Sequence, residues 1–220
     1  MAELSKRLMS IYRMVPQSVV ADIGADHGKL IIALVENGIA SHGYAVENKK
    51  GPFERLQKAV KKAGLEDKIE VIYSDGLKDL PNFVSTIVIA GMGGHLIVEI
   101  LKRDRLKLAN VQTIIVDAHN ALDKVRDEIT KLGYIISDEE IVLDANKYYE
   151  IIKFIKADIA FMSEYDKEFG PILRKEKSCL FKEKYQKRMK TIKTLIKKEN
   201  LDSVRRTELE KEKERLENIL

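Results

Sequence analysis

The chain has 220 residues, of which 45% are hydrophobic and 34% charged, and its formal net charge is +4. This length suits one domain of ordinary size with an appendage, or two small domains. A lone cysteine, Cys179, excludes a disulfide scaffold and argues against a structural zinc site. No run approaches the roughly 20 apolar residues of a membrane helix, and the N-terminus lacks the apolar segment of a secretion signal. We therefore expect a cytoplasmic protein with no membrane segment and no metal site.

Short apolar runs alternate with amphipathic stretches over the first part of the chain. Each run is β-branched or aliphatic and is bounded by Gly, Asp, Asn or Pro, which is typical of buried strands. The predicted strands are Val19–Ile23, Gly43–Val46, Ile69–Tyr73, Thr86–Ala90 and Val111–Val116. The predicted helices are Lys29–Glu36, Pro52–Ala63, His95–Leu106 and Leu122–Leu132. This alternation predicts an α/β fold with a parallel, doubly wound sheet.

The alternation stops after the last of these helices. Two strand-like runs, Tyr134–Leu143 and Tyr148–Lys156, are joined only by Asp144-Ala145-Asn146-Lys147. Because no crossover helix fits into this connection, the two strands must pair antiparallel as a hairpin. We expect a mostly parallel sheet that finishes in this hairpin, within a first domain of residues 1–160.

Residues 161–220 are expected to form a helical tail rich in Lys, Glu and Leu. The apolar residues that follow helical spacing are Tyr185, Met189, Ile192 and Ile196, then more loosely Val204, Leu209, Leu216 and Ile219. The segment Asn200–Ser203 can break the helix, with Asp202 or Ser203 as the next N-cap. We therefore predict two helices that fold back on one another as an antiparallel coiled-coil hairpin.

Positive charge is concentrated in this tail. Eleven Lys or Arg stand against two Glu between Ile172 and Lys198. Clustered positive charge is typical of a protein with a polyanion partner, although a Lys-rich helix can also be simply solvated.

The turn Asp22-Ile23-Gly24-Ala25-Asp26-His27-Gly28 leads from the first predicted strand into the first helix. Glycines in such a turn let backbone N–H groups approach a ligand closely. A dinucleotide fingerprint needs three glycines at set positions, and only Gly24 and Gly28 are present. Asp22 and Asp26 would repel a pyrophosphate but pair with the ammonium and sulfonium of S-adenosylmethionine (AdoMet). The turn favours AdoMet over NAD, while a turn without a ligand remains an alternative.

Acids also end the next two predicted strands. Glu47, with Asn48 beside it, is placed to hydrogen-bond the two ribose hydroxyls of an adenosine, a device that NAD enzymes share. Asp75 is placed to meet the adenine amino group and Gly76 keeps that turn close, although Asp-Gly is also an ordinary turn. Acids at three successive strand ends favour a nucleoside cofactor.

The fourth predicted strand runs into Ala90-Gly91-Met92-Gly93-Gly94. Three glycines in four positions open a flat-walled site where a planar ring can lie beside the cofactor, whereas a tight turn explains only one or two of them. Many amino-methylating enzymes carry an acid or Asn followed by two prolines here, and this chain does not. We expect Ala90 and Gly91 at the cofactor, and Gly91, Met92 and Gly93 at the reacting base.

These motifs resemble those of the TrmK-type tRNA (adenine-22-N1)-methyltransferases of bacteria, and the resemblance covers almost the whole chain. The segments that carry it are Leu4-Ser5-Lys6-Arg7-Leu8, Asp22–Gly28, Ala90–Gly94 and Lys147-Tyr148-Tyr149-Glu150-Ile151. The resemblance implies a Rossmann-like class I methyltransferase domain with a coiled-coil tail, and a target adenine near Gly91–Gly94. It implies AdoMet at Asp22, Gly24, Asp26, Glu47 and Asp75, and we add His27, Gly28, Asn48, Gly76, Ala90 and Gly91. One departure is Asp117-Ala118-His119, where the family carries Gln-Pro-Asn.

Adenine N1 has its own lone pair, so its attack on the methyl group needs no general base. Catalysis of this in-line displacement rests mainly on positioning and on a matched electrostatic field. We expect Asp26, Asp117 or backbone carbonyls around Gly91 to stabilise the positive charge of the methylated ring. Because N1 lies on the pairing edge, the base must be flipped out of a folded tRNA. The residues expected to grip the tRNA are Lys6, Arg7, Arg174, Lys175, Lys182, Lys187, Arg188 and Lys190.

Three other interpretations are open. A methyltransferase for a small molecule or another RNA base would use the tail to dimerise and would not bind tRNA. A non-catalytic AdoMet-binding module would bind both ligands without turnover. An NAD-dependent oxidoreductase is disfavoured by the missing glycine and the extra acids. We favour tRNA as the partner and a monomer as the oligomeric state.

Overall fold

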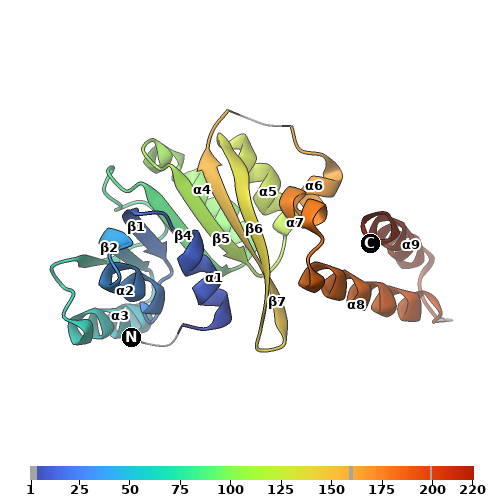
Figure 1. Cartoon of the computed structure of the whole chain (residues 1–220), viewed down its shortest axis with the longest axis horizontal. Helices are drawn as coiled ribbons and strands as arrows, with labels where there is room; N and C mark the ends of the chain where they lie inside the picture. The colour runs from blue at the N-terminus through green and yellow to red at the C-terminus, as the bar shows by residue number, and fades with distance from the viewer. Residues whose placement is uncertain (1–3, 159–160, 199) are drawn as a thin grey trace. The chain divides into compact units, whose positions relative to one another are not determined.

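The computed structural model describes residues 4–158, 161–198 and 200–220. The chain divides into two compact units, Met1–Met162 and Ser163–Leu220 (Figure 1). Within the described residues, no helix combines the length and the apolar character needed to cross a membrane.

The first unit is built on a seven-stranded sheet in the order β3-β2-β1-β4-β5-β7-β6. The strands are β1 (Ser18–Ile23), β2 (Ala40–Glu47), β3 (Ile69–Tyr73), β4 (Thr86–Met92), β5 (Thr113–Ala118), β6 (Tyr134–Asp144) and β7 (Lys147–Lys156). The first five pair in parallel, whereas β7 pairs antiparallel with both β5 and β6. The mostly parallel sheet with a terminal hairpin is therefore confirmed.

In residues 4–158, five α-helices flank this sheet. They are α1 (Lys6–Met14), α2 (Lys29–Glu36), α3 (Lys50–Ala63), α4 (Gly94–Arg103) and α5 (Leu122–Lys131). Helix α1 was not predicted; it begins after Ser5, whose hydroxyl accepts the N–H of Leu8. The predicted helix His95–Leu106 is wrong at its end, because α4 stops at Arg103 and Arg105–Leu108 forms a 3₁₀ turn.

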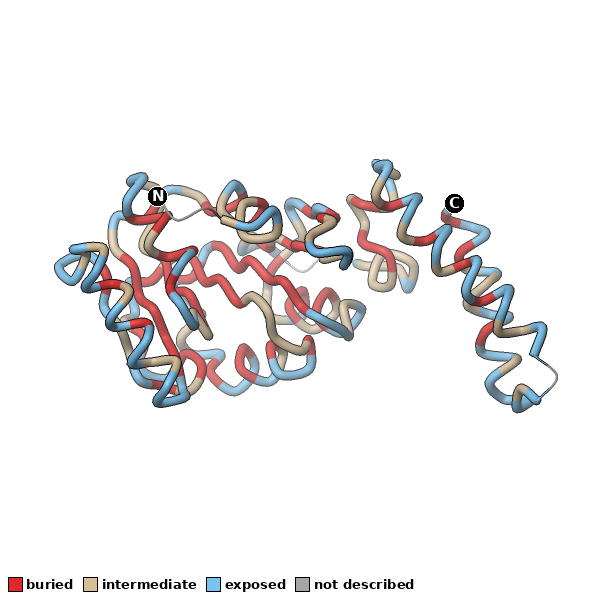
Figure 2. Tube along the Cα trace, turned by 90° about the horizontal axis from the view of Figure 1, so that it is seen from below, coloured by how far each residue is buried: buried red, intermediate tan, exposed pale blue. Residues whose placement is uncertain are grey.

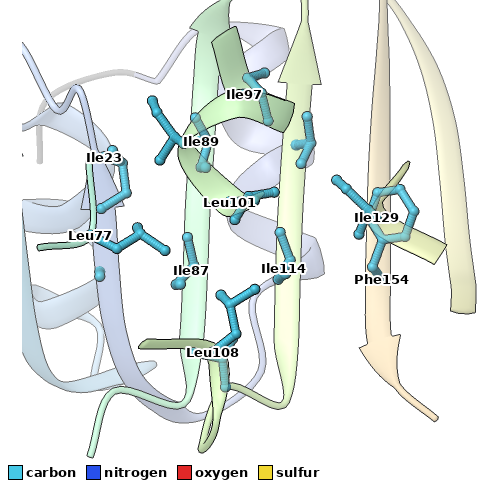
Figure 3. Close-up of a cluster of buried hydrophobic side chains, with 14 of the residues drawn as sticks. Ile23, Leu77, Ile87, Ile89, Ile97, Leu101, Leu108, Ile114, Ile129 and Phe154 are labelled. Carbon is cyan, nitrogen blue, oxygen red and sulfur yellow. The ribbon is translucent and has the colours of Figure 1, made fainter. Parts of the chain in front are cut away.

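Each face of the sheet is covered by its own apolar core. Helices α1, α2 and α3 cover one face, where Ile11, Ile31 and Leu56 are buried. On the other face, Ile97 and Leu101 of α4 and Ile129 of α5 pack on the strands (Figure 3). The central strands are buried along most of their length (Figure 2). The first unit is thus a three-layer α/β/α arrangement.

The sheet reverses its strand order beside β1, which pairs with β2 on one side and with β4 on the other. The connections that follow β1 and β4 run in opposite directions along the sheet. The carboxyl ends of β1 and β4 therefore bound a crevice. The loops that follow β1, β2, β3 and β4 all lie at this edge, because the four strands are parallel. Topology therefore gathers the motifs found in the sequence at one place.

The second unit is helical in the part that the structure describes. It contains α6 (Glu164–Phe169), α7 (Pro171–Glu176), α8 (Cys179–Ile196) and α9 (Ser203–Ile219). Arg188 pairs with Glu212, and Arg206 donates to the carbonyl of Ile196, so α8 and α9 run antiparallel. Asp202 caps α9 by accepting the N–H of Arg205, as one of the two predicted N-caps.

The apolar stripe predicted for the tail holds for most of its members. The buried ones are Tyr185, Met189, Ile192, Leu209, Leu216 and Ile219. Val204 is 66% exposed, so its place on the stripe was wrong. It lies in the first turn of α9, beside the break between the two helices.

Candidate active site

Two adjoining hollows, of about 300 and 350 Å³, open at the crevice edge of the sheet. Gly24, Asp26, Ala90 and Gly91 line both hollows, which are therefore two halves of one cleft. The first half adds Arg7, Leu8, Asp22, Ala25, His27, Lys29 and Leu30. The second half adds Glu47, Asn48, Asp75, Gly76, Met92, Leu96 and Ile100, among others.

Nearly all residues predicted at the cofactor therefore line this cleft. Gly28 lies behind it instead: a Cβ on Gly28 would stand 2.7 Å from Cδ1 of Leu56, so its absent side chain serves the packing of α2 against α3. His27 is exposed and lies at the rim.

Asp22 occupies the end of β1 and is buried. Burial raises the pKa of this carboxyl to about 7, because a charge there is deprived of water. A buried acid that faces a cleft and titrates near neutrality is suited to a cationic ligand, whose charge would restore the ionised form.

Asp26 differs from Asp22 in exposure and in partners. Its side chain is 55% exposed and lies 3.3 Å from Nη2 of Arg55 and 3.5 Å from Nε2 of His27. Its backbone has φ of +45°, a left-handed conformation that few non-glycine residues adopt. The turn thus presents one acid at its floor and one at its rim.

Glu47 is fixed in orientation by its own loop. Its Oε1 accepts the backbone N–H groups of Asn48 and Lys49, at 3.0 and 3.1 Å. The other carboxylate oxygen can still accept hydrogen bonds from a ligand hydroxyl. The Nδ2 atom of Asn48 lies 3.4 Å from Oδ1 of Asp75, which links the loops after β2 and β3.

The three glycines at the end of β4 and the start of α4 have different roles. Gly91 has φ of +79° at an irregularity in the pairing of β4 with β5, a conformation that favours glycine. A Cβ on Gly94 would stand 2.3 Å from the carbonyl oxygen of Asn120, so Gly94 allows the packing of a loop and does not widen the site. Gly93 is the N-cap residue of α4. The expectation that all three open a flat wall was therefore wrong for Gly94.

Arg7 and Asp117, predicted for separate tasks, form one ion pair. Nη1 of Arg7 lies 2.5 Å from Oδ2 of Asp117, whose side chain is fully buried. Burial raises the pKa of Asp117, and the Arg7 guanidinium opposes that rise. Arg7 also lies 5.3 Å from the ring centroid of Tyr149. Sequence reasoning missed this cluster, because its members come from distant parts of the chain.

Most of the predicted RNA-binding residues belong to the second unit. Lys175, Lys182, Lys187 and Lys190 are exposed, as is Lys6 in the first unit. Arg174 is instead held by Asp166 at 2.5 Å, and Arg188 by Glu212 through two hydrogen bonds of 2.6 and 2.7 Å. Lys175, Lys182 and Lys190 therefore offer more accessible charge than the two arginines do.

The arrangement also bears on metals and on dinucleotides. In residues 4–158, 161–198 and 200–220, no group of three or more His, Cys, Asp or Glu side chains is gathered as a metal site would require. Asp22, which is buried, and Asp26, which lies at the rim, flank the glycine turn. Their two carboxylates would repel a pyrophosphate, so the turn does not suit a dinucleotide.

Comparison with known proteins identifies the family. Residues 20–219 match the model of the family described as TrmK, tRNA (adenine(22)-N(1))-methyltransferase. The chain is 31% identical over 224 residues to the tRNA (adenine(22)-N(1))-methyltransferase of Bacillus subtilis (strain 168), an alignment that covers 96% of this chain and 91% of that protein.

Solved structures agree with this match. The Streptococcus pneumoniae protein Sp1610 in complex with S-adenosyl-L-methionine has a TM-score of 0.92 and 34% identity, covering 99% of this chain and 100% of that one. M. capricolum TrmK in complex with S-adenosyl-homocysteine has a TM-score of 0.88 and 26% identity, covering 98% of this chain and 96% of that one. By sequence and by fold, the chain belongs to the TrmK family of tRNA (adenine(22)-N(1))-methyltransferases.

Proposed function

We propose that this protein transfers the methyl group of AdoMet to N1 of adenine 22 in tRNA, as the family description states. The observation that carries the proposal is one cleft, at the reversal of strand order, lined by Asp22, Glu47 and Asp75 from the ends of three strands. Family membership supports the class of substrate, and the cleft is where we propose that AdoMet binds.

The residues of the cleft fit AdoMet. Glu47, with one oxygen fixed by its own loop, would bind the ribose hydroxyls. Asp75 and Gly76 would meet the polar edge of the adenine ring, with Leu96 and Ile100 as apolar walls. Asp22 and the backbone of the turn would receive the amino acid part. When bound, AdoMet supplies an electrophilic methyl group on a sulfonium.

Positioning is then the main task of this chain during methyl transfer. Adenine N1 attacks without prior deprotonation, so the protein must align the base and stabilise the charge that the ring gains. We expect Asp26 and the carbonyl groups around Gly91 to stabilise that positive charge, because Asp26 and Gly91 line both halves of the cleft. Asp117 is buried under the compensating charge of Arg7, and we therefore assign it a positioning role.

The tail serves tRNA binding in this account. The α8–α9 pair is proposed to be an antiparallel coiled-coil hairpin whose exposed lysines, Lys175, Lys182, Lys187 and Lys190, contact tRNA phosphates. The roles of the two units follow: residues 1–160 bind AdoMet and residues 161–220 bind tRNA. We propose a monomer that works in the cytoplasm and flips the target base out of its stack.

Transfer of a radiolabelled methyl group tests the proposal. The protein is incubated with labelled AdoMet and an unmodified tRNA transcript, and label is counted in the RNA. We expect the wild type to incorporate label into the RNA. The Glu47→Gln variant should incorporate less, because its contact with the ribose of AdoMet is weakened. AdoMet binding without label in the tRNA transcript would overturn the proposed activity and leave a binding module or an enzyme for a small molecule or another RNA.

A further inference from the structure

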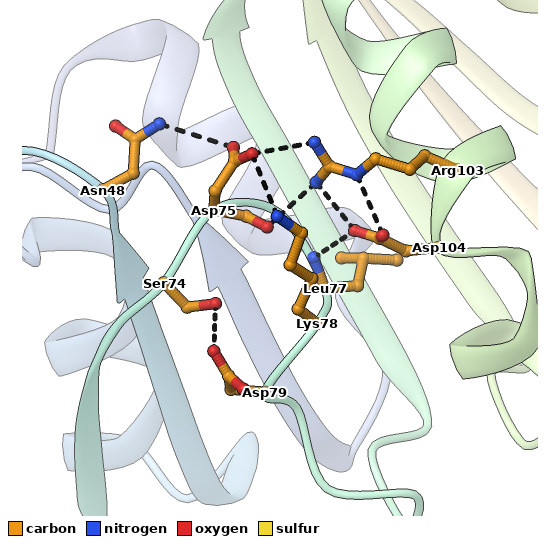
Figure 4. A network of polar contacts seen from close by, with 8 residues as sticks. All are labelled: Asn48, Ser74, Asp75, Leu77, Lys78, Asp79, Arg103 and Asp104. Atoms are coloured by element: carbon orange, nitrogen blue, oxygen red, sulfur yellow. Dashed lines mark hydrogen bonds and ion pairs between the residues drawn. The ribbon is translucent and has the colours of Figure 1, made fainter.

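Asp75 stands at the adenine end of the proposed cofactor site, on the loop after β3. Its side chain is 44% exposed, and an exposed carboxylate is ordinarily free to rotate. Here it is restrained on both oxygens (Figure 4). Nη1 of Arg103 donates to its Oδ2 at 2.8 Å, and Nδ2 of Asn48 lies 3.4 Å from its Oδ1. Nη2 of Arg103 also donates to the backbone carbonyl of Asp75 at 2.9 Å.

Arg103 is itself held in place. It is the last residue of α4, and its Nε and Nη2 both donate to the carboxylate of the adjacent Asp104 at 2.9 Å. The Asp104 side chain is buried, and its Oδ2 also accepts the N–H of Leu77 at 2.8 Å. The Arg103 guanidinium holds the pKa of Asp104 below its ordinary value, so Asp104 stays ionised. Helix α4 and the loop after β3 are thereby joined by charge-assisted hydrogen bonds.

The position of Gly76 leaves room for the contact between Arg103 and Asp104. A Cβ on Gly76 would stand 2.3 Å from Nη2 of Arg103 and 2.7 Å from Oδ2 of Asp104. A side chain there would force the Arg103 guanidinium or the Asp104 carboxylate to move. The network is therefore unlike an isolated surface ion pair, whose side chains are loosely held and which contributes little.

The same helix builds the apolar and the polar parts of the adenine site. Leu96 and Ile100 of α4 line the hollow, and Arg103 lies one turn further along the helix. Asp75 lines the same hollow, so an adenine ring packed against Leu96 and Ile100 would present an edge to its carboxylate. A carboxylate accepts hydrogen bonds only, so it favours an edge that carries an amino group.

We propose that Arg103 is a positioning residue, which fixes the Asp75 carboxylate so that it selects a cofactor whose purine carries a 6-amino group. This inference rests on the proposed function, because it takes the cofactor to be AdoMet. Arg103 does not contact the reacting atoms; it acts through Asp75. Asp104 in turn orients Arg103.

The test compares two ligands of equal charge by isothermal titration calorimetry. One is S-adenosyl-homocysteine, and the other is its analogue with hydrogen in place of the 6-amino group. The ratio of the two affinities isolates the hydrogen bond to the amino group. We expect the wild type to prefer S-adenosyl-homocysteine by about tenfold or more, since a hydrogen bond to a charged group is lost with the analogue.

Three variants resolve the role of Arg103. Asp75→Ala removes the acceptor and should bring the ratio close to one. Arg103→Gln should lower the ratio to within about threefold of one, while affinity for the analogue changes little. Lys102→Gln is the matched control, because Lys102 is adjacent, bears the same charge and pairs with Glu128 on α5. Its ratio should equal that of the wild type.

The outcomes separate the inference from the proposed function. If the wild type binds neither ligand, the assignment of the cofactor fails. If the wild type shows the preference and Arg103→Gln retains it, Arg103 does not position Asp75. Equal weakening of both ligands in Arg103→Gln would mean a general structural role and would also overturn the inference. Thermal unfolding of each variant confirms that it is folded.

Discussion

Arg7 and Asp117 lie 110 positions apart in the chain, yet Nη1 of Arg7 is 2.5 Å from Oδ2 of Asp117. The arginine lies on α1, and the fully buried aspartate is the last residue but one of β5. A Cβ on Gly91 would stand only 3.4 Å from the same guanidinium, so the pair lies directly beside the cleft. Helix α1 is thus tied to the sheet next to the site where the base is proposed to react.

Removing Arg7 and removing Asp117 should lower the free energy of unfolding by different amounts. Arg7→Gln leaves a buried carboxylate without its counter-charge and should lower the free energy of unfolding by about 3 kcal/mol. Asp117→Asn leaves a partly exposed guanidinium that water can solvate, so its cost should be smaller. Urea denaturation at pH 7.5 measures both, with Lys6→Gln as the adjacent, exposed control. Equal costs for the two variants would show that the charge of Asp117 is not compensated by Arg7.

Asp22 should make AdoMet affinity depend on pH. With its pKa raised to about 7, Asp22 is largely protonated in the free protein at lower pH, and a cationic ligand requires the ionised form. Affinity should therefore rise with pH by up to about tenfold per unit below pH 7 and level off above it. Calorimetry from pH 5.5 to 7.5 measures this rise.

Asp22→Asn is the matched variant for this pH dependence. It should bind AdoMet more weakly, with an affinity that changes little over the same range. If the variant keeps the wild-type pH dependence, another group is responsible and Asp22 does not pair with the cofactor.

Arg126 should be essential for the stability of the first unit. Its side chain is fully buried on α5, with Nε 2.8 Å from Glu139 and Nη2 2.5 Å from Glu150. Burial alone lowers the pKa of Arg126, but the two glutamates outweigh burial and keep it charged. Arg126→Met leaves these two buried glutamates without their positive partner. It should lower the free energy of unfolding by about 3–5 kcal/mol at pH 7.

The loss in Arg126→Met should shrink as the pH is lowered and the stranded glutamates take up protons. Lys124→Met, on the exposed side of the same helix, should stay close to the wild type. A pH-independent loss in Arg126→Met would point to packing rather than charge as the main contribution.

The lysines of the second unit should dominate the salt dependence of tRNA binding. Replacing Lys175, Lys182 and Lys190 together by Gln should weaken binding and lower the slope of log K against log salt by about 2–3, at roughly 0.7–0.9 for each phosphate that is no longer neutralised. The control with the same change in charge is Lys58, Lys61 and Lys62 of α3, which are also exposed. Equal slopes for the two triple variants would place the tRNA elsewhere.

The sequence predicted the sheet well because buried parallel strands carry continuous β-branched runs between turn residues. Helix α1 was not predicted although its sequence carries a local signal, because Ser5 is its N-cap and Leu8, Ile11 and Tyr12 follow helical spacing. Its placement in the fold depends on the distant hairpin. The N–H of Arg7 donates to Asp144, and the hydroxyl of Ser10 to Glu140. No local pattern encodes such contacts.

The candidate site divides in the same way. Asp22, Glu47 and Asp75 were found because parallel topology brings the ends of neighbouring strands to one edge, so position along the chain was enough. Arg103 was not predicted because it lies at the C-terminal end of α4, 28 positions after Asp75, to which it donates a hydrogen bond. Its proposed role follows from side-chain geometry, which the order of residues does not give.

Nucleoside analysis of the RNA product decides whether the protein methylates N1 of adenine 22. The protein is incubated with AdoMet and two tRNA transcripts that differ only in having adenine or guanine at position 22, and the digested RNA is analysed by mass spectrometry. We expect 1-methyladenosine from the first transcript and none from the second. A different methylated nucleoside, or 1-methyladenosine from both transcripts, would contradict this expectation.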